Sequence, residues 1–178
     1  NAGTAGLNTA VGDDAGTAVT TGIRNTLVGS EAGDALIDAD DNVAVGALSL
    51  SADTYGSKST AIGRGALKTQ DFTTATDAHN TAVGYSAGEL VTTGTNNTLV
   101  GSLAGDNINT SSSNTAVGYA ALSAENSHGS NTAIGFGTLT VQDAGAVAYN
   151  VAVGHNAGTT ISTGVNNTLI GGLAGSVL

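Results

Sequence analysis

Apolar and polar positions alternate in a five-residue phrase that recurs ten times along the chain. The phrase reads Asn or Ser, Thr or Val, Ala or Leu, Val or Ile, then Gly. Its copies begin at Asn8, Asn25, Asn42, Ser59, Asn80, Asn97, Asn114, Asn131, Asn150 and Asn167. All spacings are 17 residues except one of 21 and one of 19. Such alternation closed by Gly predicts a short strand and a turn, and the fixed period predicts stacked copies of one unit.

We therefore predict an all-β fold, a parallel β-roll or β-solenoid of about ten 17-residue coils, as a single repetitive domain over residues 1–178. Coil positions are numbered here from the Asn or Ser. Position 5 is Gly in every coil, which indicates a positive φ or the close approach of a stacked coil. Position 1 is Asn in nine coils of ten, so we expect a ladder of stacked amides along the axis.

The coils also form a higher repeat of four types, which predicts how the core is filled. In the first and second types position 9 is Gly and position 12 is apolar, as in Gly33 and Leu36. In the third and fourth types position 9 is Leu and position 12 is polar, as in Leu67 and Gln70. Each coil thus supplies one bulky apolar side chain from one of two places, as a thin core of fixed volume would require.

Both faces of the predicted strand are apolar or small. Positions 2 and 4 share one face and positions 1, 3 and 5 the other, because side chains alternate along a strand. Position 4 is always Val or Ile, and position 3 is Ala or Leu. One roll can cover only one of these faces, so we expect the other to meet a sister chain in a homo-oligomer, with a trimer as the preferred state.

Composition narrows the choice of partners. The chain has no Cys, Pro, Met or Trp, and 14 acidic against 4 basic residues give a net charge of −10. This charge argues against nucleic acid or an anionic membrane as partner. No apolar run approaches the roughly 18 residues of a membrane helix, and we expect no membrane insertion. The pattern is already under way at Asn1, so we expect the chain to be a piece of a longer fibre.

The phrases at Asn80–Gly88 and Asn114–Leu122, which read NTAVGYSAG and NTAVGYAAL, resemble the head repeats of YadA-like trimeric autotransporter adhesins. They are also similar to longer coils of bacteriophage tail fibres and related bacterial surface fibres. The resemblance covers nearly the whole chain. It implies a left-handed β-roll, a homotrimer, an extracellular place on a cell surface or virion tail, and attachment to a cell-surface receptor such as a glycan. The 17-residue coil is longer than the adhesin coil, and we expect the extra residues to form a loop on one edge.

Two long connections are the candidate receptor contacts. They run over residues 68–79 and 140–149 and follow the two fourth-type coils. At about 4.8 Å per coil they should project from one edge about 19 Å apart. Loops on a rigid scaffold often carry binding, although insertions are also simply tolerated at loop tips. The candidate residues are Gln70, Asp71, Phe72, Gln142, Asp143 and Tyr149.

One acidic cluster is a candidate calcium site. Asp38, Asp40 and Asp41 bring three carboxylates within four residues, and Ca²⁺ prefers oxygen ligands. No EF-hand or calcium-roll glycine pattern accompanies them, and a solvated acidic loop is the alternative reading. We predict no other metal site, no cofactor and no catalytic residues, because no nucleophile elbow, phosphate-binding loop or zinc spacing occurs.

Three functions remain in competition. The first is a structural and adhesive segment of a trimeric fibre, and it is not an enzyme. The second is an ice-binding solenoid that uses the Thr column at position 2, although such faces usually carry two Thr columns and position 4 here is Val or Ile. The third is a polysaccharide depolymerase, which needs two carboxylates projecting together from a groove. Tyr85, Tyr119 and Phe136 at position 6 suggest an exposed aromatic strip or a turn filler.

Overall fold

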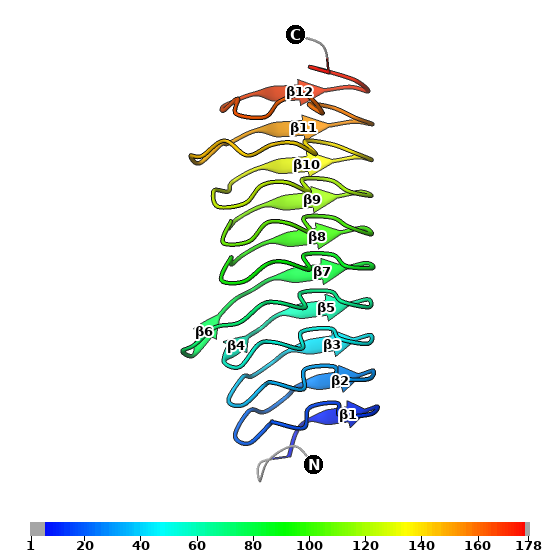
Figure 1. Ribbon diagram of the computed structural model, residues 1–178, viewed down its shortest axis with the longest axis vertical. Coiled ribbons are helices and arrows are strands. Elements are labelled where there is room, and N and C mark those ends of the chain that lie inside the picture. The colour runs from blue at the N-terminus through cyan, green and yellow to red at the C-terminus, as the bar shows by residue number, and fades with distance from the viewer. Residues whose placement is uncertain (1–5, 177–178) are drawn as a thin grey trace.

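The computed structural model is a rod in which the chain winds through ten stacked coils (Figure 1). The structure describes residues 6–176, and over this range it contains short strands and no helix. The strands are β1 (Thr9–Val11), β2 (Thr26–Val28), β3 (Val43–Val45), β4 (Gly56–Ser57), β5 (Thr60–Ile62), β6 (Thr76–Asp77), β7 (Thr81–Val83), β8 (Thr98–Val100), β9 (Thr115–Val117), β10 (Thr132–Ile134), β11 (Val151–Val153) and β12 (Thr168–Ile170). The prediction of a parallel β-solenoid with 17-residue coils is confirmed.

Ten strands form one parallel sheet along the whole rod. Their order follows the chain, from β1 to β12 with β4 and β6 left out. In every pair of neighbouring strands, residues at the same coil position lie opposite one another. Thr81, for example, pairs with Thr98, and Val83 pairs with Val100. The strands β4 and β6 form a second small sheet at the edge where the long fourth coil projects (Figure 1). Each phrase therefore lies directly over the one before it.

The coil corners depend on left-handed backbone at fixed positions. The last residue of each coil, just before the Asn or Ser that begins the next coil, has a φ between 50° and 66° in all nine complete coils although it is never Gly. These residues are Arg24, Asp41, Lys58, His79, Asn96, Ser113, Ser130, Tyr149 and Asn166. Such a conformation costs about 1 kcal/mol per L-residue, so the sheet and core that flank each corner must hold it in place.

The strand buries positions 1 and 3 and presents positions 2 and 4 to the outside. In β8, Leu99 at position 3 is fully buried, whereas Thr98 and Val100 on either side are exposed. The same alternation holds in the other strands of the ten-stranded sheet from β2 to β11 (Leu27, Ala44, Ala61, Ala82, Ala116, Ala133 and Ala152 have no exposed surface). The face expected to need a sister chain is therefore the one that carries the Thr and Val or Ile columns.

The core alternates small and large side chains as predicted. Leu50, Leu67, Leu122 and Leu139 at position 9 are fully buried, as are Leu36, Val91 and Ile108 at position 12. The last apolar residue of this set, Leu178, lies outside the described residues. A side chain at Gly33 would meet Leu27 Cδ2 at 2.7 Å and Leu36 Cδ1 at 2.8 Å. Gly at position 9 thus makes room for the bulky residue of its own coil, and also for a Leu at position 3.

The asparagine ladder runs inside the roll and joins neighbouring coils. Asn97 is typical: its Nδ2 donates to the carbonyl of Ser111 in the same coil at 2.9 Å. Its Oδ1 accepts the backbone N–H of Asn114 in the next coil at 3.0 Å, and the Asn114 Nδ2 at 3.2 Å. The amides therefore bond mainly to backbone rather than to one another. Each one closes its own coil and fixes the next, which satisfies polar groups that burial would otherwise leave unpaired.

Candidate functional site

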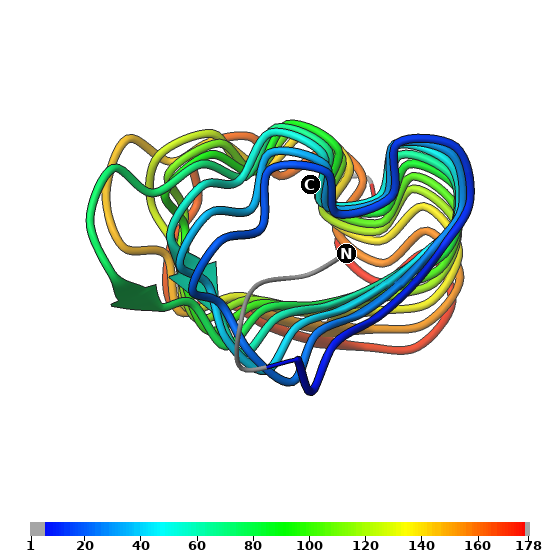
Figure 2. The ribbon, with the colours of Figure 1, turned by 90° about the horizontal axis from the view of Figure 1, so that it is seen from below.

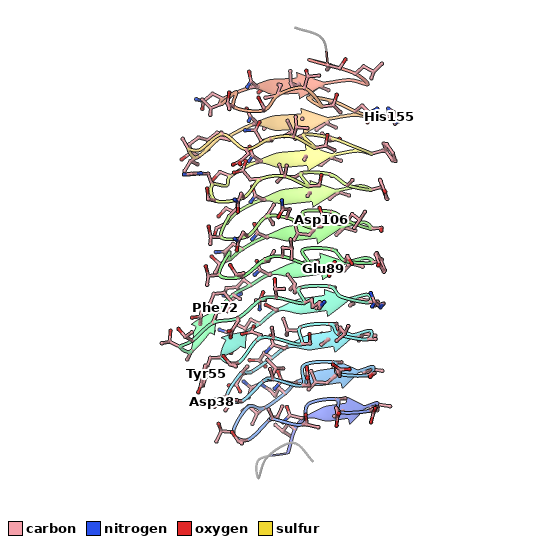
Figure 3. All side chains as sticks on the ribbon, viewed as in Figure 1. Asp38, Tyr55, Phe72, Glu89, Asp106 and His155 are labelled. Atoms are coloured by element: carbon pink, nitrogen blue, oxygen red, sulfur yellow. The ribbon has the colours of Figure 1, made fainter. Side chains whose placement is uncertain are left out.

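The two long connections project from the same edge of the rod, as predicted (Figure 2). Residues 68–79 and 140–149 form the two widest bulges in Figure 2, and both project to the left of the main sheet in Figure 1. Asp38, Tyr55 and Phe72 lie along this edge (Figure 3). The edge is therefore where the coil changes length without disturbing the stack.

Three of the six candidate receptor contacts turn inward. Gln70 and Gln142 have no exposed surface, and Phe72 is 6% exposed. Asp71 is half-buried and accepts a hydrogen bond from Thr54 Oγ1 at 2.8 Å. Only Asp143 and Tyr149 are fully available to a partner, with Tyr149 61% exposed. The interpretation of Gln70, Gln142 and Phe72 as contact residues is corrected on this ground.

Burial of the two glutamines follows from their coil position. Both occupy position 12, whose side chain points into the roll in the other coils as well. There each glutamine Oε1 accepts a hydrogen bond from the next asparagine of the ladder, Asn80 at 2.8 Å and Asn150 at 3.0 Å. Asp53 and Glu125, at position 12 of the third-type coils, are also fully buried. Sequence reasoning missed these two carboxyls, although the fixed coil position could have revealed them.

Burial raises the pKa of both interior carboxyls. Asp53 accepts hydrogen bonds from Gln70 Nε2 at 2.6 Å and from the N–H groups of Gly56 at 2.9 Å and Phe72 at 3.2 Å, which partly offset the loss of water. Glu125 accepts only two bonds, both at 3.2 Å, from the backbone of His128 and from Asn131. Removal from water raises the pKa of Glu125 to about 7. Neither carboxyl has any exposed surface, so neither is accessible from outside the roll.

The candidate calcium residues bind groups of the coil below instead of converging. Thr21 Oγ1 donates to Asp38 at 2.6 Å, and the N–H of Ile23 donates to Asp40 at 2.8 Å. Asp41 forms a two-bond pair with the Arg24 guanidinium at 2.5 and 2.9 Å, which lowers the Asp41 pKa. Over residues 6–176, no three His, Cys, Asp or Glu side chains are grouped so that they could hold a metal ion. The acidic loop is better described as a set of inter-coil contacts.

The outward face of the main sheet is a long surface without charge. Its two columns are Thr or Val at position 2 and Val or Ile at position 4, aligned strand by strand. Val11, Ile62, Val100 and Ile134 are exposed by 36–58%, and the remaining position-4 residues between β2 and β11 are half-buried. We call these two columns the outward face. Continuous apolar stripes of this kind are uncommon on the surface of monomeric proteins.

The aromatic residues at position 6 are exposed, and the rings of Tyr119, Phe136 and His155 stack on one another, whereas the Tyr85 ring lies beside the Arg64 guanidinium. Tyr119 and Phe136 have ring centroids 5.2 Å apart, and Phe136 and His155 are also 5.2 Å apart, with interplanar angles of 14° and 8°. His155 marks this strip at the turn edge of the rod (Figure 3). The shared ring faces are covered within the stack, so a sugar could use only its two end faces. The strip joins three coils at their turns.

Comparison with protein-family models, with curated proteins and with solved structures finds no match to this chain. Within residues 6–176, the structure has no helix with the length and apolar character to span a membrane. Two surfaces of the rod are therefore the candidates for binding a partner. They are the outward face and the edge that bears Asp143 and Tyr149.

Proposed function

We propose that this chain is a structural segment of a homotrimeric extracellular fibre that contributes to attachment on a cell surface or virion tail. In this assembly three left-handed rolls place their outward faces against one another around a common axis. The long connections point away from the axis, where Asp143 and Tyr149 can meet a surface receptor such as a glycan. Weak contacts repeated along a rod gain strength by multivalency.

The observation that carries the proposal is the uncharged outward face. It runs the full length of the described rod, and each coil contributes one Val or Ile and one Thr or Val to it. Covering such a column removes apolar side chains from water at a gain of about 25 cal/mol per Å². Exact register between coils also lets identical chains match layer by layer, because every layer presents the same two positions.

The mass in solution tests this proposal. Native mass spectrometry or light scattering should give about 51 kDa, three times the chain mass of 17.1 kDa. Val117→Lys places three ammonium groups near the proposed axis and should produce monomers, since like charges in an apolar interface repel and are desolvated. Ser123→Lys, in the same coil and at the position where Lys68 occurs naturally, is the control and should remain trimeric. A wild-type chain that is monomeric at all concentrations would falsify the proposal.

Ice binding is the second candidate, and the alignment of Thr on the outward face favours it. Eight of the ten position-2 residues are Thr, interrupted by Val43 and Val151. A monomer that shows thermal hysteresis, reduced in Thr115→Leu but retained in Ser123→Lys, would select ice binding over the fibre. A trimer without thermal hysteresis would reject it.

A further inference from the structure

The turn that follows each strand carries a column of flat side chains with one gap. The column is position 6, directly after the glycine of each phrase, and its residues lie above one another because the strands stack in register. Backbone hydrogen bonds join the turns on both sides of the gap, from the Leu103 N–H to the Tyr85 carbonyl at 2.9 Å and from the Ala120 N–H to the Ser102 carbonyl at 3.0 Å. From the fourth coil to the ninth, position 6 is occupied by Arg64, Tyr85, Ser102, Tyr119, Phe136 and His155. Five of these six side chains end in a planar group, and only Ser102 does not.

The planar groups on both sides of Ser102 are already stacked on their far sides. The Tyr119 ring stacks on Phe136 in the next coil, with centroids 5.2 Å apart and an interplanar angle of 14°. The Arg64 guanidinium of the preceding coil lies over the Tyr85 ring, with its Cζ 5.9 Å from the ring centroid. The ring faces that remain, one on Tyr85 and one on Tyr119, are therefore those turned toward the coil of Ser102.

The gap has the thickness of one flat group. Tyr85 and Tyr119 lie two coils apart, which is about 10 Å at about 4.8 Å per coil. A flat group at the level of Ser102 would lie about 5 Å from each ring, which matches the 5.2 Å between the stacked rings of this column. Tyr85 is 53% and Tyr119 49% exposed, so a partner has access from solvent at the turn edge, where His155 marks the column (Figure 3).

A planar cation is the group that suits this gap. The face of an aromatic ring is its negative side and attracts a cation, and here two phenol faces are directed at one space. The chain itself provides the precedent, because the Arg64 guanidinium stacks on Tyr85 in the same column. The net charge of −10 also attracts cations to the rod. A lysine ammonium would bring the charge without the two flat faces.

We propose that the gap over Ser102, between Tyr85 and Tyr119, is a binding slot for the guanidinium group of an arginine on another protein. The guanidinium stacks between the two phenol rings, and the Ser102 hydroxyl can accept one of its N–H groups. A second copy of this chain is a poor source, because Arg24 is paired with an aspartate and Arg64 lies over Tyr85. The slot lies at the turn edge, beyond the glycine that ends the strand, and is separate from the outward face.

A proton NMR titration of the full chain tests the slot. The probe is Nα-acetyl-arginine amide, whose Cδ protons should move upfield because the ring currents of two phenols shield protons placed between their faces. Half-saturation should occur on the order of 10 mM, as expected for one cation–π contact on each side of the guanidinium. Nα-acetyl-lysine amide has the same charge without a flat group, and its Cε protons should shift roughly tenfold less at equal concentration.

Ser102→Tyr fills the slot from within and should remove most of the shift. Tyrosine already occupies position 6 in the coils on either side, so the variant should keep the fold, which circular dichroism verifies. Ser30→Tyr is the matched control, since it makes the same change at position 6 of the earlier second-type coil and should leave the shift unchanged. Tyr119→Leu removes one wall and should reduce the shift by roughly half. Tyr149→Leu, on the opposite edge of the rod, should have no effect.

Equal shifts of the arginine and lysine probes, or a shift that persists in Ser102→Tyr, would overturn the proposal, because charge alone would then explain the effect. Methyl glucoside protons that move upfield with the wild type but not with Ser102→Tyr, while the arginine probe does not respond, would overturn it in favour of a sugar. The titration does not require a trimer. A monomeric chain that binds the arginine probe would therefore reject the fibre and support the slot.

Discussion

At the scale of single residues, the glycine that ends each phrase is required for two reasons. All ten have a φ between 124° and 143°, a region that L side chains rarely adopt. Nine of them would also drive an added Cβ into the backbone of the next coil, as at Gly84, where it would lie 2.4 Å from the carbonyl oxygen of Gly101. The sequence predicted that one of these two causes applies, and the structure shows both.

Gly84→Ala should therefore destabilise the rod by about 3 kcal/mol or more, from backbone strain and from separation of two coils. The measurement is the midpoint of denaturant unfolding followed by circular dichroism. Gly145→Ala is the matched control, because a Cβ there meets nothing within 4 Å although φ is +66°. It should cost only about 1 kcal/mol. Equal losses in the two variants would show that close approach of the coils is unimportant.

Glu125 makes the stability depend on pH. Its pKa is about 7 in the folded chain against a reference of 4.5, so the folded state holds more protons between these pH values. Stability should then be fully present below about pH 4.5 and should fall as the pH rises through 7, with a contribution of about 3 kcal/mol.

Glu125→Gln places at this position the residue that Gln142 already supplies one coil later, and it should remove this part of the pH dependence. Thermal unfolding at pH 5 and pH 8 provides the comparison. Asp38→Asn, a neutralisation on the exposed edge, should leave the difference between the two pH values as in the wild type. A Glu125→Gln profile that matches the wild type would contradict a raised pKa at this site.

At the scale of the element, the interior of each coil is filled by pairs of positions whose side chains compete for the same space, so that a large residue at one position requires Gly at the other. Leu99 at position 3 is fully buried, and a Cβ at Gly105 would lie 2.6 Å from its Cδ2. The sequence showed the exchange between positions 9 and 12. It did not show that position 3 takes part, because the direction of that side chain depends on which strand face turns inward.

A double-mutant cycle tests this shared volume. Leu99→Ala should cost about 3 kcal/mol through the cavity it leaves, and Gly105→Ala about 1–3 kcal/mol through overpacking and strain. In the double variant the new methyl group enters the space that the leucine vacated, so the total should be smaller than the sum. Additive losses in the unfolding midpoints would mean that the two positions do not compete for space.

At the scale of the whole molecule, the rod is a sum of neighbouring coils that follow a four-coil sequence of packing types. Deleting the coils from Asn42 to Ser113 joins a second-type coil to a third-type coil, which is the natural order. Such proteins are stabilised mainly by contacts between neighbouring repeats. The shortened chain should therefore fold, with a β-type circular dichroism spectrum and a cooperative transition.

Deleting only the coils from Asn25 to Lys58 is the control, because it places a first-type coil beneath a fourth-type coil. This order of core volumes does not occur in the chain, and the unfolding midpoint should fall further than in the longer deletion. If both deletions behave alike, the four-coil order is not a packing requirement.

The periodic sequence by itself determined the class of fold, the register and most of the core, because a repeated phrase can satisfy every coil only if the coils stack on one another. The position-5 glycines, the alternation of Leu67 and Gly88 at position 9 and the asparagine ladder were all readable from this period. Tertiary structure alone decided which strand face turns inward and which polar residues are enclosed. Gln70 resembled a loop residue until its coil position proved to lie inside the roll, since burial depends on the path of the closed coil and not on the polarity of one side chain.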